Sequence, residues 1–346
     1  RKKTDTIREG GMQDNLEIYW HELEERYAGA EGVYRRLDLE KETGIRMAVL
    51  SPGRTWAILI EILPEDASVL MPPRWRGLGF RIIPLAGPEP GAKHVCLCVV
   101  NPEHRSVFTA LSYDIIRTLE SSDMTIRVRN LQSCFNRWSR FFERWDQEGI
   151  SAERQRGLFG ELMVLGTLLR AGLSPLDVAS SWKGSSGAYQ DFIHLAAAIE
   201  VKTTVSKEPR KVSISNEKQL DDTDLESLAL VVLTLNEVEA GGISLPDAVA
   251  TVRQLLEDDG RAGSIFESSL IEAGYLDSDS DKYSKRYTIR SREIFDIRSG
   301  FPRIISVPSG VGDLRYTVMI SACKPFEKTI GEMIREFAGR ASNELD

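Results

Sequence analysis

The sequence lacks the features that would place the protein in a membrane or mark it for secretion. None of its apolar runs approaches the roughly 18 consecutive residues that a membrane-spanning helix requires. The first eleven residues are polar and contain no apolar signal region, and Met12 could itself be the natural start of the chain. We therefore expect a protein without a membrane partner.

Cysteine is scarce and is not paired in motifs. The four cysteines show no C-x-x-C spacing, which argues against both a disulfide framework and a zinc site; they are Cys96, Cys98, Cys134 and Cys323. This usage predicts a reduced, cytoplasmic protein.

Several common enzyme signatures are also missing. The run Gly184-Ser185-Ser186-Gly187 has no lysine of a phosphate-binding P-loop, and the chain contains no G-x-S-x-G nucleophile elbow. Gly77-Leu78-Gly79 is not followed by a third glycine at the dinucleotide-binding spacing. These absences exclude the commonest P-loop, serine-hydrolase and dinucleotide-binding sites.

Composition and charge describe an ordinary globular chain with an acidic second half. Of its 346 residues, 42% are hydrophobic and 28% charged, and the net charge is −8. Residues 1–150 hold 21 Lys and Arg against 22 Asp and Glu, and the remainder holds 23 against 30. Binding to polyanions such as DNA would therefore depend on a local basic patch.

The first part of the chain alternates short strand patterns with Pro/Gly-rich turns. Apolar spacing predicts strands at 45–50, 56–63, 80–84 and 94–100, with helices at 16–27, 107–119 and 131–147. Gly149 then interrupts the pattern. We predict an N-terminal β-rich plus helical domain over residues 1–150.

The second part has an α/β order. The pattern predicts a helix at 153–170, strands at 189–194, 197–203, 212–215 and 228–235, and a helix at 246–256. Helices at 265–273 and 326–338 and a strand at 286–289 follow. We assign residues 151–260 to a core domain and 261–346 to a C-terminal extension that packs on it.

An acid and a base lie two residues apart in the strand predicted at 197–203. Side chains alternate between the faces of a strand, so Glu200 and Lys202 share one face, and Ile199, Val201 and Thr203 point into a core on the other. The alternative interpretation is an exposed ion pair on an edge strand, worth about 0 to 1 kcal/mol.

Asp191 lies in the preceding predicted strand, and a tight turn can bring it alongside Glu200. Two carboxylates and a backbone carbonyl, here that of Val201, are ligands that suit Mg²⁺ or Mn²⁺. A lysine beside such an ion can orient or deprotonate a water. The pattern predicts a metal site at Asp191, Glu200 and Val201, with Lys202 next to it.

Glu161 is a fourth candidate, on the predicted helix at 153–170. It lies between Leu158 and Leu165 on the apolar side, where an unpaired carboxylate is costly. An ion or a lysine would compensate for that cost. The alternative is a carboxylate on the helix surface.

This pattern resembles the PD-(D/E)XK nuclease superfamily: Asp191, an eight-residue gap and Glu200-Val201-Lys202 follow a helix that bears Glu161. Gln190 stands where the superfamily's name has proline, which is commonly absent. The chain is most similar to the prokaryotic family called PD-(D/E)XK motif proteins. The segments that carry this likeness are Gly160-Glu161-Leu162, Trp182-Lys183-Gly184, Gln190-Asp191-Phe192, Ile199-Glu200-Val201-Lys202-Thr203-Thr204, Ile214-Ser215-Asn216-Glu217-Lys218-Gln219-Leu220 and Phe301-Pro302-Arg303-Ile304.

The resemblance implies a restriction-endonuclease-like α/β core and a Mg²⁺-dependent DNA endonuclease with Glu161, Asp191, Glu200 and Lys202 as catalytic residues. It also implies a place in restriction or anti-phage gene clusters, with a methyltransferase, a helicase or an ATPase as possible protein partners. The alternative is an inactive subunit that keeps the nuclease fold as an adaptor or DNA-binding scaffold.

Two further groups are candidates for substrate binding. Ser215 and Gln219 could contact a phosphate or the lysine, or they could cap the helical turn that begins there. The second group lies on one side of a predicted helix and consists of Arg137, Arg140 and Arg144. These arginines could contact phosphates, although a solvated amphipathic helix is the favoured interpretation.

Overall fold

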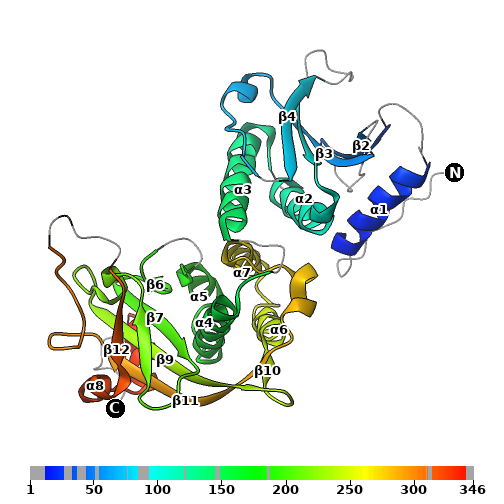
Figure 1. The fold of residues 1–346 in the computed structure, drawn as a ribbon. Helices are drawn as coiled ribbons and strands as arrows, with labels where there is room; N and C mark the ends of the chain where they lie inside the picture. The colour runs from blue at the N-terminus through cyan, green and yellow to red at the C-terminus, as the bar shows by residue number, and fades with distance from the viewer. Residues whose placement is uncertain are drawn as a thin grey trace. The chain divides into compact units, whose positions relative to one another are not determined.

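The computed structural model describes residues 12–26, 33–36, 44–50, 54–75, 77–84, 93–120, 122–144, 149–184, 188–308, 310 and 314–339. Residues 1–11 and the helix end predicted at 147 lie outside these ranges. The chain forms two compact units, Arg1–Glu143 and Arg144–Asp346 (Figure 1). The boundary that we expect near residue 150 and the one at 260 remain predictions.

Unit 1 is built around an antiparallel sheet of five strands in the order β1-β2-β3-β5-β4. Its strands are β1 (Val33–Arg36), β2 (Ile45–Leu50), β3 (Thr55–Ile62), β4 (Leu78–Pro84) and β5 (Lys93–Val99), and its helices are α1 (Met12–Arg26), α2 (Arg105–Glu120) and α3 (Met124–Arg144). The short 3-10 turn η1 (Glu65–Ser68) lies between β3 and β4, and η2 (Pro102–His104) follows β5. The β-rich and helical character predicted for this part of the chain is confirmed.

Unit 2 contains a mixed sheet of five strands in the order β10-β11-β9-β7-β6. In chain order these are β6 (Phe192–His194), β7 (Ala197–Thr204), β9 (Ser227–Val238), β10 (Ile243–Ser244) and β11 (Arg286–Asp296). Strands β7 and β9 are parallel, and the other pairings are antiparallel. The sheet belongs to a mixed α/β fold, as predicted.

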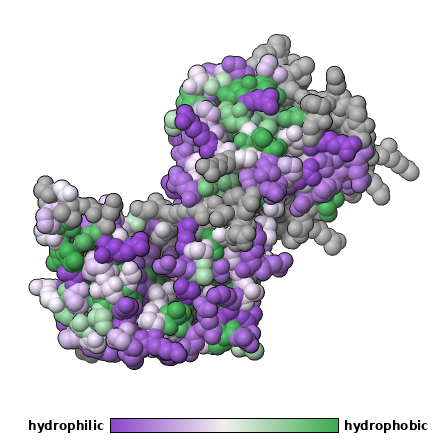
Figure 2. Space-filling model, viewed as in Figure 1, coloured by the Kyte–Doolittle hydropathy of each residue, from purple (hydrophilic) through white to green (hydrophobic). Residues whose placement is uncertain are grey.

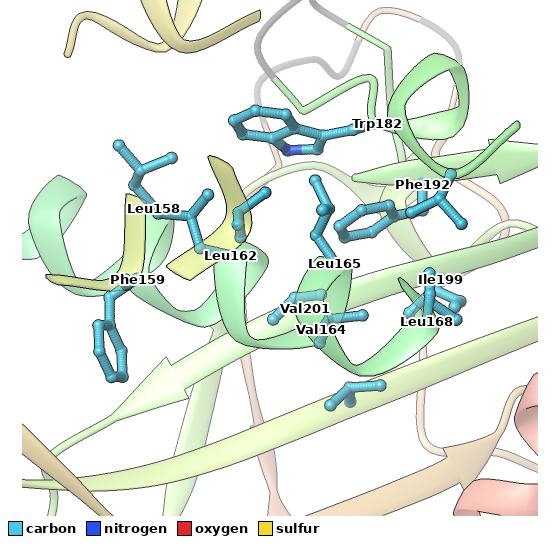
Figure 3. Packing of buried hydrophobic residues seen from close by; sticks show 14 of the residues in the cluster. Leu158, Phe159, Leu162, Val164, Leu165, Leu168, Trp182, Phe192, Ile199 and Val201 are labelled. Carbon is cyan, nitrogen blue, oxygen red and sulfur yellow. The ribbon is translucent and has the colours of Figure 1, made fainter. Parts of the chain in front are cut away.

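One face of this sheet is covered by helices (Figure 1). They are α4 (Ala152–Arg170), α5 (Pro175–Ser181), α6 (Leu245–Leu255) and α7 (Gly260–Ala273). Ser151 caps the N-terminus of helix α4: its hydroxyl accepts the Arg154 amide hydrogen at 3.4 Å. Figure 3 shows α4 side chains such as Leu162 and Leu165 packed among Trp182 and Val201. This packing fixes the helix that carries Glu161 against the strand that carries Glu200.

The opposite face is covered by a second, smaller layer. It consists of the two-stranded sheet of β8 (Lys211–Ile214) with β12 (Tyr316–Met319), the turn η3 (Glu217–Leu220), the short helix α8 (Ile320–Cys323) and η5 (Lys324–Phe326). Ala198, Leu230 and Val232 of the main sheet are buried against this layer. The chain also contains η4 (Asp277–Lys282) and α9 (Ile330–Phe337).

Several sequence-based boundaries need correction. The strand predicted at 189–194 begins only at Phe192, so Asp191 lies just before it. The helices predicted from 131 and 265 begin earlier, at Met124 and Gly260. The strand predicted at 212–215 is present as β8 and pairs with β12 outside the main sheet. The strand at 286–289 continues to Asp296, because it pairs along the whole apolar strand β9. The last helix begins at Ile330, where the Thr329 side chain caps it, and not at 326.

The visible surface is mostly hydrophilic, with hydrophobic residues in separate small patches (Figure 2). Among the helices that the structure describes, none has the length and apolar character needed to pass through a membrane.

Two glycines on α4 allow a matched test of the contact between helix and sheet. A Cβ built on Gly160 would lie 2.4 Å from Thr203 Cγ2, whereas one on Gly157 would meet no described atom within 4 Å. Gly160→Ala should therefore lower the free energy of unfolding by about 1 to 3 kcal/mol through overpacking. Gly157→Ala should raise it by up to about 1 kcal/mol, because alanine favours helix.

Chemical denaturation of both variants would measure this difference. A Gly160→Ala protein as stable as Gly157→Ala would contradict the close approach of α4 to β7.

Candidate active site

The site lies beside the start of β6, where β7 extends beyond this short partner strand. His194 pairs with Ala197 and Phe192 with Ile199, and continuing this register places Asp191 opposite Glu200. Because β6 begins only at Phe192, no strand residue occupies that edge of β7. The Asp191 carboxylate takes its place: Oδ2 accepts the Val201 amide hydrogen at 2.8 Å.

The chain before Asp191 folds back on its backbone. The carbonyl oxygen of Asp191 accepts the amide hydrogens of Lys183 at 2.6 Å and Gly184 at 3.1 Å. A Cβ on Gly184 would lie 2.8 Å from Asp191 Oδ1 and 2.7 Å from Glu161 Oε2. The two carboxylates therefore converge on the space left by the missing side chain of Gly184.

Glu161 reaches this space from α4 and is held by an indole. The Nε1 hydrogen of buried Trp182 is donated to Glu161 Oε2 at 2.7 Å. Trp182 also forms an isolated bridge with Phe192, so one residue links the helix to the start of β6. The sequence prediction that Glu161 faces inward agrees with this position.

Glu200 lies at the centre of the group, with 0% of its side chain exposed. Lys202 Nζ is 2.6 Å from Glu200 Oε1, and 16% of the lysine side chain is exposed. This ion pair is close but poorly aligned, and neither Glu200 oxygen has a well-formed hydrogen bond to the described residues. Ile199 and Val201 pack into the core on the other face, as predicted.

Burial dominates the electrostatics of the two carboxyl groups, Glu200 and Asp191. Burial, reinforced by Asp191, raises the pKa of Glu200 well above its ordinary value, and the attraction of Lys202 only partly offsets this. The pKa of Asp191 is also raised by burial. Burial alone would lower the pKa of Lys202, but Glu200 and Asp191 outweigh it and raise that pKa. Lys202 is thus held as an ammonium.

Gln219 contacts the lysine, as one of the two interpretations of this residue predicted. Its side-chain oxygen Oε1 accepts hydrogens from Lys202 Nζ at 3.2 Å, Ser215 N at 3.0 Å and Ser215 Oγ at 3.2 Å. The capping interpretation is wrong for these two residues, because the side chain of Asn216 caps η3 by accepting from Lys218 N. Ser215 contacts Gln219 and is exposed to solvent.

Arg137 and Arg140 of α3 lie in unit 1, whereas Arg144, the last residue of α3, is the first residue of unit 2. Arg137 Nη2 lies 2.6 Å from Asp114 Oδ2, and 14% of its side chain is exposed. The same Asp114 oxygen accepts a hydrogen from Trp138 Nε1 at 2.8 Å. Arg140 is half-buried, and the side chain of Arg144 lies outside the described part. Phosphate binding by these arginines stays a prediction, and Arg137 has a structural partner.

The residues around Glu200 suit a divalent cation. Ionised Glu161, Asp191 and Glu200 with one lysine leave two excess negative charges, and a fully buried carboxylate without well-formed hydrogen bonds is unfavourable unless a cation compensates it. Within the described ranges, no three His, Cys, Asp or Glu side chains form a ready metal cage. Mg²⁺ does not require one, since it usually combines one or two carboxylates with waters and substrate phosphate.

Sequence reasoning gave no role to three residues that shape the site. These are Trp182, which binds Glu161, Gly184, which leaves room for two carboxylates, and buried Gln190, whose amide Nε2 donates to Lys218 O at 2.8 Å. All three lie in segments that carry the family resemblance. The sequence therefore marked them as part of the family pattern but did not show what they do.

Comparison with known families agrees with this geometry. A family model described as "Putative PD-(D/E)XK family member (DUF4420)" matches residues 16–321. No curated protein and no solved structure matches the chain. The matched range covers most of each unit and all the site residues around Glu200, and the chain therefore belongs to this PD-(D/E)XK family.

Proposed function

We propose that unit 2 is a metal-dependent nuclease that hydrolyses phosphodiester bonds in DNA. The observation that carries this proposal is the convergence of Asp191, Glu200 and Lys202, with Glu200 fully buried and without well-formed hydrogen bonds. Membership of a PD-(D/E)XK family supports a hydrolase of this class. Carboxyl groups whose pKa values are strongly shifted by burial and by a charged partner cluster at functional sites, which supports an active site here.

The residues have distinct roles in this proposal. Asp191, Glu200 and the carbonyl of Val201 would hold Mg²⁺ or Mn²⁺, which supplies Lewis-acid activation of phosphate and water when bound. Lys202 is an ammonium, so it donates hydrogen bonds that orient the attacking water or a phosphate oxygen, and does not act as a base in the metal-free site. Glu161 would act as a further ligand or as a partner of the lysine.

The biological setting is part of the same proposal. The DNA target, a role in restriction or anti-phage defence, and partners such as a methyltransferase, a helicase or an ATPase rest on the family resemblance. Residues 151–346 carry 30 acidic against 23 basic residues, which disfavours tight DNA binding by charge alone. A partner that delivers DNA, or a local basic surface, would compensate.

Three variants separate metal binding from the role of the lysine. Asp191→Asn and Glu200→Gln remove negative charge from the proposed ligands, so they should weaken Mg²⁺ binding by about tenfold or more and abolish cleavage. Lys202→Met should abolish cleavage while Mg²⁺ binding stays equal or becomes tighter, because a competing cation is lost. Calorimetric titration and plasmid cleavage measure the two properties.

The matched control is Lys285→Met, since Lys285 pairs with Glu237 instead of a site carboxylate. It should retain wild-type binding and cleavage. Cleavage that continues in excess chelator would exclude the metal mechanism. Binding of Mg²⁺ without any cleavage by the wild type would favour an inactive scaffold that keeps the nuclease fold.

The raised pKa of Glu200 predicts how stability depends on pH in the absence of metal. The folded protein retains a proton that the unfolded chain releases near the ordinary pKa of about 4.3. The free energy of unfolding should therefore fall as pH rises above that value and through the folded pKa, by at most about 1.4 kcal/mol per pH unit for one proton. Glu200→Gln should make this slope shallower between pH 5 and 8.

Urea denaturation in chelator at several pH values provides the measurement. Glu237→Gln is the control, because Lys285 and Arg156 lower the pKa of Glu237 and it is fully ionised over this range. It should keep the wild-type slope. An unchanged slope in Glu200→Gln would show that Glu200 is ionised in the metal-free protein.

A further inference from the structure

Gln219 lies in the turn η3, and this short turn could not by itself hold the Gln219 side chain in its observed position. Gln219 Oε1 accepts hydrogens from Lys202 Nζ and from both the amide and the hydroxyl of Ser215. A 3-10 turn of four residues has little stability of its own. The location of this oxygen therefore depends on what anchors the turn.

Gln190 anchors η3 from the side of the carboxylates. Its side chain is buried with 7% exposed, and Nε2 donates to the carbonyl oxygens of Lys218 at 2.8 Å and Asp221 at 3.5 Å. Gln190 immediately precedes Asp191 in the chain. One backbone segment thus carries both the proposed metal ligand and the anchor of the turn that contacts the lysine.

Arg303 anchors the other end of η3 from a distant part of the chain. Its Nη1 donates to the carbonyl oxygen of Leu220, and its Nη2 lies 2.9 Å and 3.0 Å from the two carboxylate oxygens of Asp222. The arginine side chain is only 4% exposed. A buried guanidinium with two such partners gives a rigid attachment.

The same C-terminal segment also supports the strand that leads into the turn. Tyr316 of β12 pairs with Ile214 of β8, and Ser215 is the next residue. The Tyr316 hydroxyl accepts the Ile304 amide hydrogen at 3.4 Å. Arg303, Ile304 and β12 therefore hold both the approach to η3 and its end.

We infer that Gln190 and Arg303 are positioning residues that clamp η3 and so keep Gln219 on the ammonium of Lys202. The inference rests on the proposed function, in which Lys202 orients the reacting groups. Gln219 is needed because a metal ion and Lys202 would compete for the Glu200 carboxylate. A cation bound to the Glu200 carboxylate would displace the lysine from its acceptor at 2.6 Å, and Gln219 offers a fixed second acceptor at 3.2 Å.

A lysine side chain without that second acceptor would sample many rotamers, because it has four rotatable bonds and loses considerable entropy when fixed. The C-terminal segment is thus a component of the site and not a separate attachment to the core.

The test uses Gln190→Met, which removes the amide donor without adding charge, and Arg303→Lys, which keeps the charge but loses the forked geometry. Arg253→Lys is the matched control, because Arg253 forms a comparable forked pair with Glu267 and Asp277 in unit 2. Gln219→Met serves as the reference for complete loss of the contact. All variants are made in the full chain.

The first readout does not require activity. The Ser215 amide donates to Gln219, so its hydrogen exchange, measured by NMR, reports whether η3 is held. Exchange should accelerate by about tenfold or more in Gln190→Met and Arg303→Lys, approaching Gln219→Met, and stay unchanged in Arg253→Lys.

The second readout is kinetic. Both clamp variants should lower kcat by roughly 10- to 100-fold, while KM for DNA and the half-saturating Mg²⁺ concentration stay close to wild type. Unchanged exchange at Ser215 would overturn the inference, and so would faster exchange with an unchanged kcat, although the proposed function would stand in both cases. A wild type that neither binds Mg²⁺ nor cleaves DNA would instead refute the proposed function, and the exchange data would still decide whether Gln190 and Arg303 hold Gln219.

Discussion

The candidate site in unit 2 depends on one unfavourable burial: a glutamate with no exposed surface, Glu200, in the middle of the inner strand β7. A buried carboxylate requires compensation, and the only cation within contact distance among the described residues is the ammonium of Lys202. Two more carboxylates nearby make this compensation incomplete. In the proposed function, a divalent cation bound by these carboxylates would complete the compensation.

The geometry around Glu200 follows from a strand that is too short. Strand β6 has three residues, so the edge of β7 next to Glu200 is unpaired, and Asp191 satisfies the Val201 amide with a side chain where a strand would use its backbone. The absence of a side chain at Gly184 then gives room for Asp191 and Glu161 on the same side. Close packing of α4 through Gly160 sets the distance from which Glu161 reaches that space.

The second layer, on the opposite face of the sheet, connects the site residues to the C-terminal part of the chain. Strand β8 lies outside the main sheet, pairs with β12 and leads into η3. Gln219 therefore reaches Lys202 from the layer that covers this face of the sheet. Gln190 and Arg303 join this layer to the core with buried polar contacts. Such contacts are directional, and they fix an orientation that apolar packing alone would leave loose.

Most elements and the candidate residues at the centre of the site could be predicted from the amino-acid sequence. The period of two in Ile199 to Thr203 predicted which side chains share a face of the strand, because alternation on a strand is a local property of the backbone. The start of β6, the partner of β8 and the contacts of Trp182, Gln190 and Arg303 became evident in the folded structure. These depend on residues far apart in the chain, as Arg303 and Asp222 are, and no local periodicity encodes such pairs. Arg137 illustrates the same limit, since its spacing predicted a solvated stripe and its partner Asp114 comes from another helix.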